Sequence, residues 1–356
     1  MSVRVAVVGA GWWASNHHVP SLAAYGPAEL VALCDEDRGR AAEVAHEHGV
    51  PEVVTDVDEL LRVGADAVVI ATPHVTHHDL AAPLLDAGVH VLVEKPLTTR
   101  ATDAFDLVRR AERSGAHLAV GYTDQHAPTA SRVRDAVRRD IGDLVQVMAE
   151  FSSGTAGLFA RAEADSAEVT SARAGSDDGE PHDQHPRTYG AAMGGGQAHT
   201  QLTHVMGMVC WTTGREVREV AAFVDHRGRE VDVDDAAAFR LVGGGTGVVT
   251  STGMAGEAGA ERRHVRYLGT RGSVDHDMTS GEATVRCVDG TTAHLSPPPE
   301  EPGRRTWAPA RALVDLVRGD GENLAPGGAG AATTAFVEAM LLATETRKVV
   351  DVPRLP

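Results

Sequence analysis

Short apolar runs alternate with longer amphipathic segments along the first third of the chain. The runs are rich in valine, leucine and isoleucine, which is typical of strands buried on both faces of a parallel sheet. They cover residues 3–8, 29–33, 67–71, 90–93 and 117–121. Helices are predicted between them at 13–24, 37–48, 76–87 and 101–114. Strands and helices that alternate at this pitch predict right-handed crossovers and a doubly wound α/β sheet.

The remaining two thirds of the chain show apolar and polar positions in alternation, which is typical of strands with one exposed face. These strands recur from 217 to 295, and the glycines at 243–245 predict a hairpin because no helix follows them. A polar segment, 152–187, predicts an enlarged loop over a cleft, with or without a role in binding. We therefore expect a doubly wound α/β domain, 1–123, and a second α/β domain, 124–356.

One further helix is predicted at 197–211, with an apolar stripe at helical spacing. The stripe consists of Leu202, Val205, Met206 and Val209. A different face carries polar side chains, namely Gln197, Thr200, Gln201 and His204. A polar helix face is usually only solvated, so this pattern by itself does not make His204 catalytic.

The first apolar run leads directly into a G-x-G-x-x-A turn that opens a helix. Gly9 permits the tight turn, Gly11 lets the backbone approach a pyrophosphate, and Ala14 lets the helix pack close to the strand. The N–H groups and the helix dipole there favour a phosphate. Asp35 follows roughly 20 residues past the turn, where an acidic side chain accepts hydrogen bonds from the adenosine ribose and favours NAD over NADP. Asp35 could also cap the next helix, and Arg38 is a nearby group that would accommodate a 2′-phosphate.

Lysine is almost absent from this chain. Lys95 and Lys348 are the two lysines among 33 basic residues, and the others are arginine. Lys95 stands at the carboxyl end of a predicted strand, after Glu94 and before Pro96, which restricts it to an extended conformation. An ammonium can lose its proton or act as a compact donor, which a guanidinium does poorly. We expect Lys95 to have a chemical role and not merely to pair with Glu94 at the surface.

Charge and cysteine content exclude several classes of protein. The formal net charge of −17 argues against a nucleic-acid partner, because phosphates repel an acidic surface. No apolar run approaches a membrane span, and the amino terminus lacks the pattern of a secretory signal. The cysteines, Cys34, Cys210 and Cys287, suit neither a disulfide framework nor a zinc site. We expect a cytoplasmic protein with no metal site and no membrane partner.

These motifs resemble the Gfo/Idh/MocA family, to which glucose–fructose oxidoreductase and inositol 2-dehydrogenase belong. The resemblance extends over nearly the whole chain, and its matching stretches are 5–14, 72–77, 87–97 with its Glu-Lys-Pro element, 194–204 and 332–350. It implies a dinucleotide-binding Rossmann domain, 1–123, followed by a substrate-binding α/β domain, 124–356, with a large, mostly antiparallel open sheet. Such a sheet commonly joins subunits, so the resemblance implies a homodimer or homotetramer.

The resemblance also implies roles for individual residues. Lys95 corresponds to the active-site lysine that contacts the reacting hydroxyl, and its peptide bond to Pro96 is often cis in the family. His204 occupies the position of a histidine that faces the nicotinamide, whereas Thr200 stands where relatives have an aspartate. The other cofactor-binding residues expected from the motifs are Trp12, Trp13, Thr72, Pro73, His77 and Glu94.

Two departures from the family pattern affect the expected chemistry. Thr200 can orient an imidazole but cannot stabilise its charge, so we expect His204 to be less basic and Lys95 to carry more of the proton transfer. Relatives often have a basic residue at the position of Gln125, so the sugar contacts differ. The candidate substrate-binding residues are Tyr122, Thr123, Gln125, His185, Tyr189 and Gln201.

The sequence therefore predicts an NAD-dependent enzyme, with NADP as the less favoured cofactor, that transfers a hydride to or from a secondary alcohol of a sugar, a cyclitol or the sugar moiety of a glycoside. One alternative is an NADPH-dependent ketosugar reductase of deoxysugar or aminosugar biosynthesis. Another is a regulator that senses dinucleotide and sugar without turnover; the loss of the aspartate at Thr200 favours it, and the presence of Lys95 and His204 disfavours it.

Overall fold

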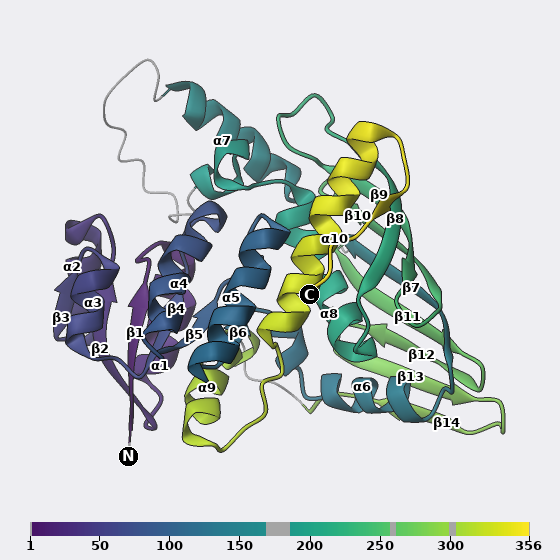
Figure 1. The fold of residues 1–356 in the computed structure, drawn as a ribbon, viewed down its shortest axis with the longest axis horizontal. Helices are drawn as coiled ribbons and strands as arrows, with labels where there is room; N and C mark the ends of the chain where they lie inside the picture. Colours follow the sequence, from purple (N-terminus) through teal and green to yellow (C-terminus); the bar gives the residue numbers. More distant parts are fainter. Residues whose placement is uncertain (1, 169–185, 257–260, 299–303, 356) are drawn as a thin grey trace.

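The structure is a computed structural model in which residues 2–168, 186–256, 261–298 and 304–355 are described. The strands of these ranges form two sheets, which stand side by side with helices between them (Figure 1). The purple and blue first third builds the smaller sheet, and the green segment builds most of the larger one. The expected α/β fold, with one parallel and one mostly antiparallel sheet, is confirmed.

The smaller sheet is parallel throughout, in the order β3-β2-β1-β4-β5-β6. Its strands are β1 (Val3–Val8), β2 (Ala28–Cys34), β3 (Glu52–Val54), β4 (Ala67–Ile70), β5 (His90–Val93) and β6 (Leu118–Val120). The valine-rich strands β1, β4 and β5 are buried on both faces, because helices cover the sheet on both sides. The chain order reverses between β1 and β4, and sheets of this kind bind ligands beyond the carboxyl ends of the strands at that point.

Local capping explains where the helices of this domain begin and end. The Asp37 carboxylate accepts the N–H groups of Gly39 and Arg40 at the start of α2, which ends at Gly49 with φ of +68°. Asp56 caps α3 in the same way. The helical segments here are η1 (Ala14–His18), α1 (Val19–Ala23), α2 (Arg38–His48), α3 (Val57–Val63), η2 (His74–Thr76), α4 (His77–Asp86) and α5 (Ala101–Ser114).

The structure differs from the expected first domain in two places. The helix expected at 13–24 is divided into a π-helical turn, η1, and a short α1. The strand β3 and the helix α3 were not predicted, because a three-residue strand and a seven-residue helix are too short to show a clear periodicity.

The larger sheet has the order β14-β13-β12-β11-β7-β10-β9-β8-β15, and its neighbours are antiparallel except for β7 and β10. Its strands are β7 (Leu144–Ser152), β8 (Val217–Asp225), β9 (Asp234–Leu241), β10 (Thr246–Thr252), β11 (Arg262–Gly269), β12 (Gly272–Asp277), β13 (Glu282–Cys287), β14 (Thr292–Leu295) and β15 (Val350–Asp351). The glycines at 243–245 join β9 to β10, so the predicted hairpin is confirmed.

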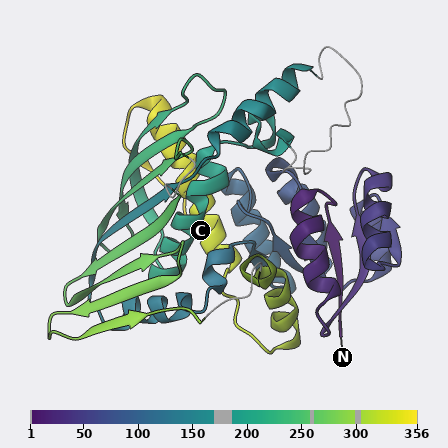
Figure 2. The ribbon, with the colours of Figure 1, turned by 180° about the vertical axis from the view of Figure 1, so that it is seen from behind.

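Helices cover one face of the larger sheet and leave the other uncovered in the described part of the chain (Figures 1 and 2). The covering helices are α6 (Ala130–Arg139), α8 (Thr203–Thr213) and α10 (Gly327–Thr346). The predicted apolar stripe of α8 and the π-helical turn η6 (Ala198–Leu202) before it is buried, as expected. Their polar face is not solvated, however, since Gln197 and Thr200 are buried too. Helix α10 contacts both β8 and α5 and so ties the two domains together.

Part of the expected loop at 152–187 is helical. Helix α7 (Ala156–Glu168) is alanine-rich, which favours a helix over a loop, and its Phe159 packs against Val231 and Val233. The short 3-10 segments η4 (Pro186–Tyr189) and η5 (Ala191–Met193) follow the undescribed residues. Helix α9 (Arg304–Arg318) belongs to the second half of the sequence but packs on β1, β4 and β5 of the first sheet. The boundary at 123 thus separates the two sheets but not every helix that covers them.

Asp235 on β9 gives a testable consequence of burial. Burial, and then the charge of neighbouring Asp232, raises the pKa of Asp235 well above 3.8. At a pH between the two pKa values, Asp235 keeps its proton in the folded chain and has lost it in the unfolded chain. The free energy of unfolding therefore falls as the pH rises above about 4. We expect Asp235→Asn to increase the free energy of unfolding by on the order of 1 kcal/mol at pH 7.5 and not at pH 4, measured by urea titration. Exposed Asp351→Asn is the control, and an equal gain at both pH values would contradict the assignment.

Candidate active site

The glycine turn after β1 has the shape of a dinucleotide cradle. Gly9 has φ of +98°, and a Cβ atom there would lie 2.4 Å from the carbonyl oxygen of Ala71, so only glycine fits. Gly11 faces open space, where an added Cβ would meet nothing within 4 Å. Ala14 is fully buried, and the half-buried Trp12 and Trp13 flank the turn. The open side of this turn leaves room for a pyrophosphate.

Asp35 follows β2 and is fixed beside the same turn. Its Oδ2 accepts the N–H of Ala10 at 2.7 Å. Its Oδ1 accepts the N–H of Asp37 at 2.9 Å and the Arg40 guanidinium at 2.6 Å. Asp35 does not cap α2, because Asp37 does. The arginine that donates to this carboxylate is Arg40.

Glu94 follows β5, and its carboxylate contacts fix the carboxyl end of this strand. Its Oε1 accepts the indole N–H of Trp13 at 2.8 Å and lies 2.9 Å from Nε2 of His18, while Oε2 accepts the N–H of Lys95 at 3.1 Å. Burial would raise the pKa of Glu94, but His18 and Lys95 outweigh it and lower that pKa. A Cβ at Gly121 would lie 2.6 Å from this carboxyl group. Glu94 thus links the glycine turn, β5 and β6 in one network.

His77 lies beneath the loop that precedes it, with no exposed surface. Its Nδ1 is 2.9 Å from the carbonyl oxygen of Pro96 and its Nε2 is 3.0 Å from that of Thr72. It therefore joins the loop after β4 to the loop after β5, and it reaches a cofactor only through the residues that it positions. Thr72 and Pro73 themselves are half-buried at the rim.

Lys95 extends from β5 towards the second domain. The Lys95–Pro96 peptide is cis, as the resemblance implied. The Nζ atom of Lys95 donates to the carbonyl oxygen of Thr200 on η6 at 2.9 Å. Burial lowers the pKa of Lys95 below 10.5, and Glu94 opposes this shift. The structure thus places the ammonium of the first domain against the helical segment that continues into His204.

His204 lies in the first turn of α8, with 12% of its side chain exposed. Burial, and then the charges of Lys95 and Arg263, lower its pKa well below 6.5. The Thr200 hydroxyl does not reach towards it, because this hydroxyl donates to the carbonyl oxygen of Gly196 at 2.6 Å. The structure therefore brings the Lys95 ammonium to the helical segment that leads into His204, with Thr200 contributing its backbone carbonyl.

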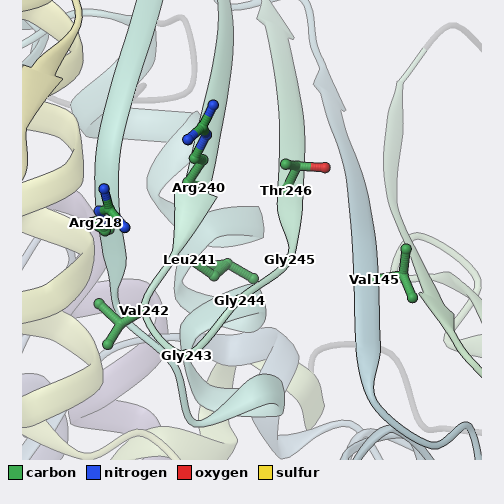
Figure 3. Close-up of a pocket in the computed structure, with 9 residues that line it drawn as sticks. All are labelled: Val145, Arg218, Arg240, Leu241, Val242, Gly243, Gly244, Gly245 and Thr246. Atoms are coloured by element: carbon green, nitrogen blue, oxygen red, sulfur yellow. The ribbon is translucent and has the colours of Figure 1, made fainter.

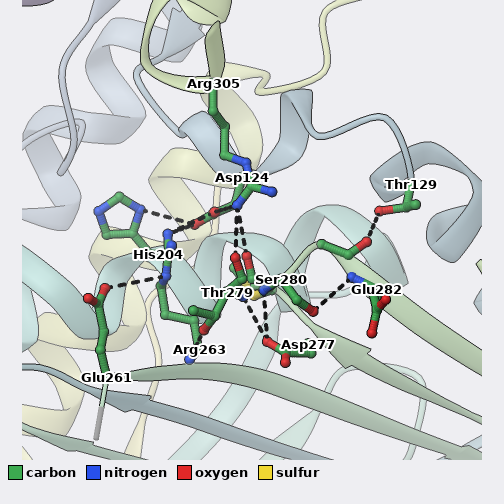
Figure 4. Close-up of polar contacts among 12 residues, drawn as sticks. Asp124, Thr129, His204, Glu261, Arg263, Asp277, Thr279, Ser280, Glu282 and Arg305 are labelled. Atoms are coloured by element: carbon green, nitrogen blue, oxygen red, sulfur yellow. Dashed lines mark hydrogen bonds and ion pairs between the residues drawn. The ribbon is translucent and has the colours of Figure 1, made fainter. Parts of the chain in front are cut away.

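Three charged residues that the sequence analysis did not single out surround this imidazole (Figure 4). Asp124 Oδ2 on η3 (Thr123–His126) lies 3.7 Å from Nδ1 of His204. Arg263 of β11 donates to both oxygens of Asp124, at 2.9 and 3.1 Å, and Arg305 of α9 lies 3.9 Å from Oδ1. These residues lie far apart in the sequence and carry no shared motif, so no spacing could have revealed the cluster.

The other candidate substrate residues after β6 are more buried than expected. Tyr122 is 1% exposed, and its hydroxyl lies 3.0 Å from that of Thr203. Thr123 is 8% exposed and Gln125 is 1% exposed. Both polar atoms of the Gln125 amide are buried and have no hydrogen-bond partner within the described residues.

The remaining candidates come from the second domain. Gln201 is half-buried next to Thr200. Tyr189 is half-buried, with its ring 6.1 Å from that of Phe159 on α7. His185 lies outside the described residues. The described residues therefore place Gln201 on the same helical segment as the site, and Tyr189 against α7.

A separate surface hollow lies on the hairpin between β9 and β10 (Figure 3). It is lined by Val145, Arg218, Arg240, Leu241, Val242, Gly243, Gly244, Gly245 and Thr246. None of the predicted site residues lines it. The chemical groups gather instead at the carboxyl end of the parallel sheet.

The residues at that end fit a dinucleotide and a hydroxyl-bearing substrate. The glycine turn leaves the space that a pyrophosphate needs, Asp35 offers a carboxylate to a ribose, and Lys95 and His204 supply a donor and a proton acceptor. No group of three histidine, cysteine or acidic side chains in the described ranges is arranged to hold a metal ion.

Comparison with known proteins identifies relatives for both domains. Residues 3–122 match a family model described as the oxidoreductase family with an NAD-binding Rossmann fold, and residues 161–275 match the GFO/IDH/MocA C-terminal domain. Among solved structures, an NAD-binding oxidoreductase from Klebsiella pneumoniae superimposes with a TM-score of 0.80 at 20% identity, and 99% of each chain is covered. At this identity the likeness shows the fold alone.

Curated relatives match over shorter stretches. Inositol 2-dehydrogenase 1 of Saccharopolyspora erythraea is 38% identical over 152 residues, which are 41% of this chain and 45% of the relative. D-glucoside 3-dehydrogenase of Escherichia coli is 30% identical over 140 residues, 39% of this chain and 40% of the relative. Each match thus spans less than half of the relative's length.

The contacts of Asp35 predict the cofactor preference. We expect Asp35→Asn to weaken NADH binding by about tenfold, because an amide accepts ribose hydrogen bonds less strongly than a carboxylate. NADPH binding should weaken less, because its 2′-phosphate no longer meets a negative charge. Fluorescence titration with each dinucleotide measures both constants. Asp37→Asn removes a neighbouring charge while keeping the helix cap, so it serves as the control. Equal losses in both Asp35→Asn titrations would contradict this role.

Proposed function

Because the chain belongs to the Gfo/Idh/MocA family of oxidoreductases, with an NAD-binding Rossmann fold at its amino terminus, we propose that it is an NAD-dependent dehydrogenase. The reaction is the transfer of a hydride between the nicotinamide and a secondary alcohol of a sugar, a cyclitol or a sugar moiety. The observation that carries the proposal is the bond from Lys95 Nζ to the Thr200 carbonyl, which brings the ammonium of the Rossmann domain to the helical segment of His204.

The side chains of this site are suited to moving the proton of the alcohol. NAD, when bound, supplies the acceptor for the hydride. Lys95 is partly desolvated and donates a hydrogen bond to the reacting oxygen, which stabilises the negative charge that develops there. His204 is neutral at physiological pH and takes the hydroxyl proton. Glu94 and His77 act beneath them by fixing the two loops at the carboxyl ends of β4 and β5.

The substrate class rests on the relatives and on the polar groups around the site. One relative is named for inositol and another for a D-glucoside, both of which present rings of secondary hydroxyl groups. Gln125 offers a buried amide with no partner among the described residues, and Thr123 and Gln201 offer further hydrogen-bonding groups. A polyhydroxylated ring satisfies several such groups at once.

The uncovered face of the larger sheet supports a homodimer or homotetramer. Phe223 on β8 is 84% exposed. Val145 on β7 and Val248 on β10, which pairs with β7 and is separated from β8 by β9, are 50% and 41% exposed. Apolar side chains in such numbers on one sheet face mark an association surface. A second copy of the chain fits this face because closed homo-oligomers are the commonest assemblies of soluble proteins.

Thiol chemistry supports a reducing cytoplasm as the compartment. Cys34, Cys210 and Cys287 are all free, and burial raises the pKa of the first two to about 12, so they stay protonated and inert. Within the described ranges, no helix is both long and apolar enough to span a bilayer.

Separate replacements of Lys95 and Lys348 test the role of Lys95. We expect Lys95→Ala to lower kcat by about 10²- to 10⁴-fold, because it removes the donor to the reacting oxygen, while NADH binding changes little. Lys348→Ala, which removes the only other lysine, should leave kcat and NADH binding unchanged. Reduction of the nicotinamide followed at 340 nm and fluorescence titration of NADH measure the two quantities. Wild-type turnover by Lys95→Ala would refute the proposal.

The substrate itself is found by direct assay. The full-length protein is offered myo-inositol, scyllo-inositol, D-xylose, methyl D-glucoside and N-acetylglucosamine with NAD⁺ and NADP⁺, and the corresponding ketones with NADH and NADPH. Steady reduction of NAD⁺ supports the proposal. Turnover with NADPH and ketones alone would identify a ketosugar reductase, and dinucleotide and sugar binding without turnover would identify a sensor.

The lowered pKa of His204 predicts the pH profile of alcohol oxidation. A proton acceptor must be deprotonated before it acts, and burial with Lys95 and Arg263 keeps His204 deprotonated to well below pH 6.5. We expect kcat/KM to show no loss from histidine protonation between pH 8 and 6.5 and to fall only at lower pH. An acid limb with a midpoint at or above pH 6.5 that disappears in His204→Gln would contradict this expectation.

A further inference from the structure

The imidazole of His204 has one nitrogen whose environment the proposed mechanism does not explain. Nδ1 is buried and lacks a hydrogen bond among the described residues, although burying an unpaired polar atom is costly. The acidic oxygen within reach is Oδ2 of Asp124, at 3.7 Å. The pair is therefore in position to form this bond.

The carboxylate of Asp124 is held in place from two other elements. It is 4% exposed and receives two contacts from Arg263 Nη1 on β11, at 2.9 and 3.1 Å. Arg305 on α9 lies 3.9 Å from Oδ1 and donates to the carbonyl oxygen of Met278. Burial raises the pKa of Asp124, and the two arginines oppose this rise. Figure 4 shows the carboxylate between these guanidinium groups and the imidazole.

No side chain of the α8 segment takes this place. The Thr200 hydroxyl is buried and donates to the Gly196 carbonyl of its own helical turn. The rings that flank His204 are those of Tyr122, 6.2 Å away between centroids, and Phe151, 5.8 Å away. Two cations, Lys95 from the end of β5 and Arg263 from β11, lower the pKa of His204. The acidic side chain beside the imidazole is that of Asp124 on η3, with Oδ2 3.7 Å from Nδ1.

We propose that Asp124 is the positioning residue of His204: it accepts the Nδ1 hydrogen, fixes the ring, and leaves Nε2 free to take the substrate proton. This inference rests on the proposed function and deepens it. In alcohol oxidation the hydroxyl proton moves to Nε2, the C–H hydride leaves for the nicotinamide, and a carbonyl forms as the imidazole becomes cationic. Figure 4 shows the second ring nitrogen pointing away from Asp124, as this division of roles requires.

The surroundings of His204 explain why such a partner is needed. Burial and the two cations all destabilise an imidazolium at this position. A carboxylate beside Nδ1 offsets that cost when the ring takes up its proton. Arg263 donates to the same carboxylate and opposes the rise in the pKa of Asp124 that burial causes. The cluster thus combines a deprotonated base before the reaction with a stabilised cation after it.

The first test observes the tautomer and needs no substrate. The full-length protein is labelled with nitrogen-15 in histidine, and the signals of His204 are assigned by their loss in His204→Gln. We expect the neutral ring to carry its proton on Nδ1 between pH 6.5 and 8, and Asp124→Asn to shift the population towards the Nε2 tautomer. A wild-type ring protonated on Nε2, or an unchanged tautomer in Asp124→Asn, would overturn the proposal.

The second test separates positioning from substrate binding. With the best substrate of the screen above, we expect Asp124→Asn to lower kcat by about 10²- to 10³-fold. KM and the NADH dissociation constant should change by less than about threefold, because the residue acts through the imidazole. Asp124→Glu, which restores the carboxylate, should recover part of kcat. A loss confined to KM would instead make Asp124 a substrate ligand and overturn the proposal.

A matched control removes a different charge from the same cluster. Glu261 lies 3.9 Å from Arg263, and its charge adds to the rise in the pKa of Asp124, so its removal leaves the carboxylate beside His204 in place. Glu261→Gln should therefore keep kcat within about twofold, and a loss equal to that of Asp124→Asn would contradict a specific role. Thermal unfolding confirms that each variant folds. If the wild type turns over no substrate, the proposed function fails, and the nitrogen-15 result still decides the pairing of Asp124 with His204.

Discussion

The contact between the Lys95 ammonium and the Thr200 carbonyl joins the two domains at the point where chemistry is expected. It depends on both sheets at once. β5 must end at Lys95 with Pro96 after it, and η6 must approach from the second domain with an accessible carbonyl. Glu94 and His77 fix the loop that carries Lys95. The packing of α10 on α5 and β8 holds the second domain, which carries Thr200, against the first.

Burial determines the electrostatics of the site. Burial lowers the pKa of Lys95 and of His204, because the exclusion of water disfavours their charged forms. The exclusion of water also strengthens the attraction between a carboxylate and a neighbouring cation. Glu94 and Asp124 are the buried acids beside these two bases, and each has its own hydrogen-bond partners. A site with few exposed groups can thus hold a neutral base ready and still stabilise the cation that it becomes.

The second domain contributes more than a sheet. Helix α9 crosses back to β1 and β5, and Arg305 at its beginning reaches Asp124. β11 supplies Arg263 to the same carboxylate from the other side. The surroundings of one histidine therefore depend on Asp124 and on an arginine that lies 139 residues further along the chain. A change in any of these segments would be felt at the imidazole through its carboxylate partner.

The sequence by itself determined the order of the elements and the ends of the buried strands. Periodicity, glycine spacing and capping are local, so they fixed β1 to β6 (apart from the short β3), the glycine turn, Asp35 and the position of Lys95 at a strand end. The tertiary structure alone decided which side chains meet across the domains. It paired Asp35 with Arg40, turned the Thr200 hydroxyl into its own helix, and brought Asp124 to His204. Such contacts follow from packing between distant segments, which leaves no periodic trace in the chain.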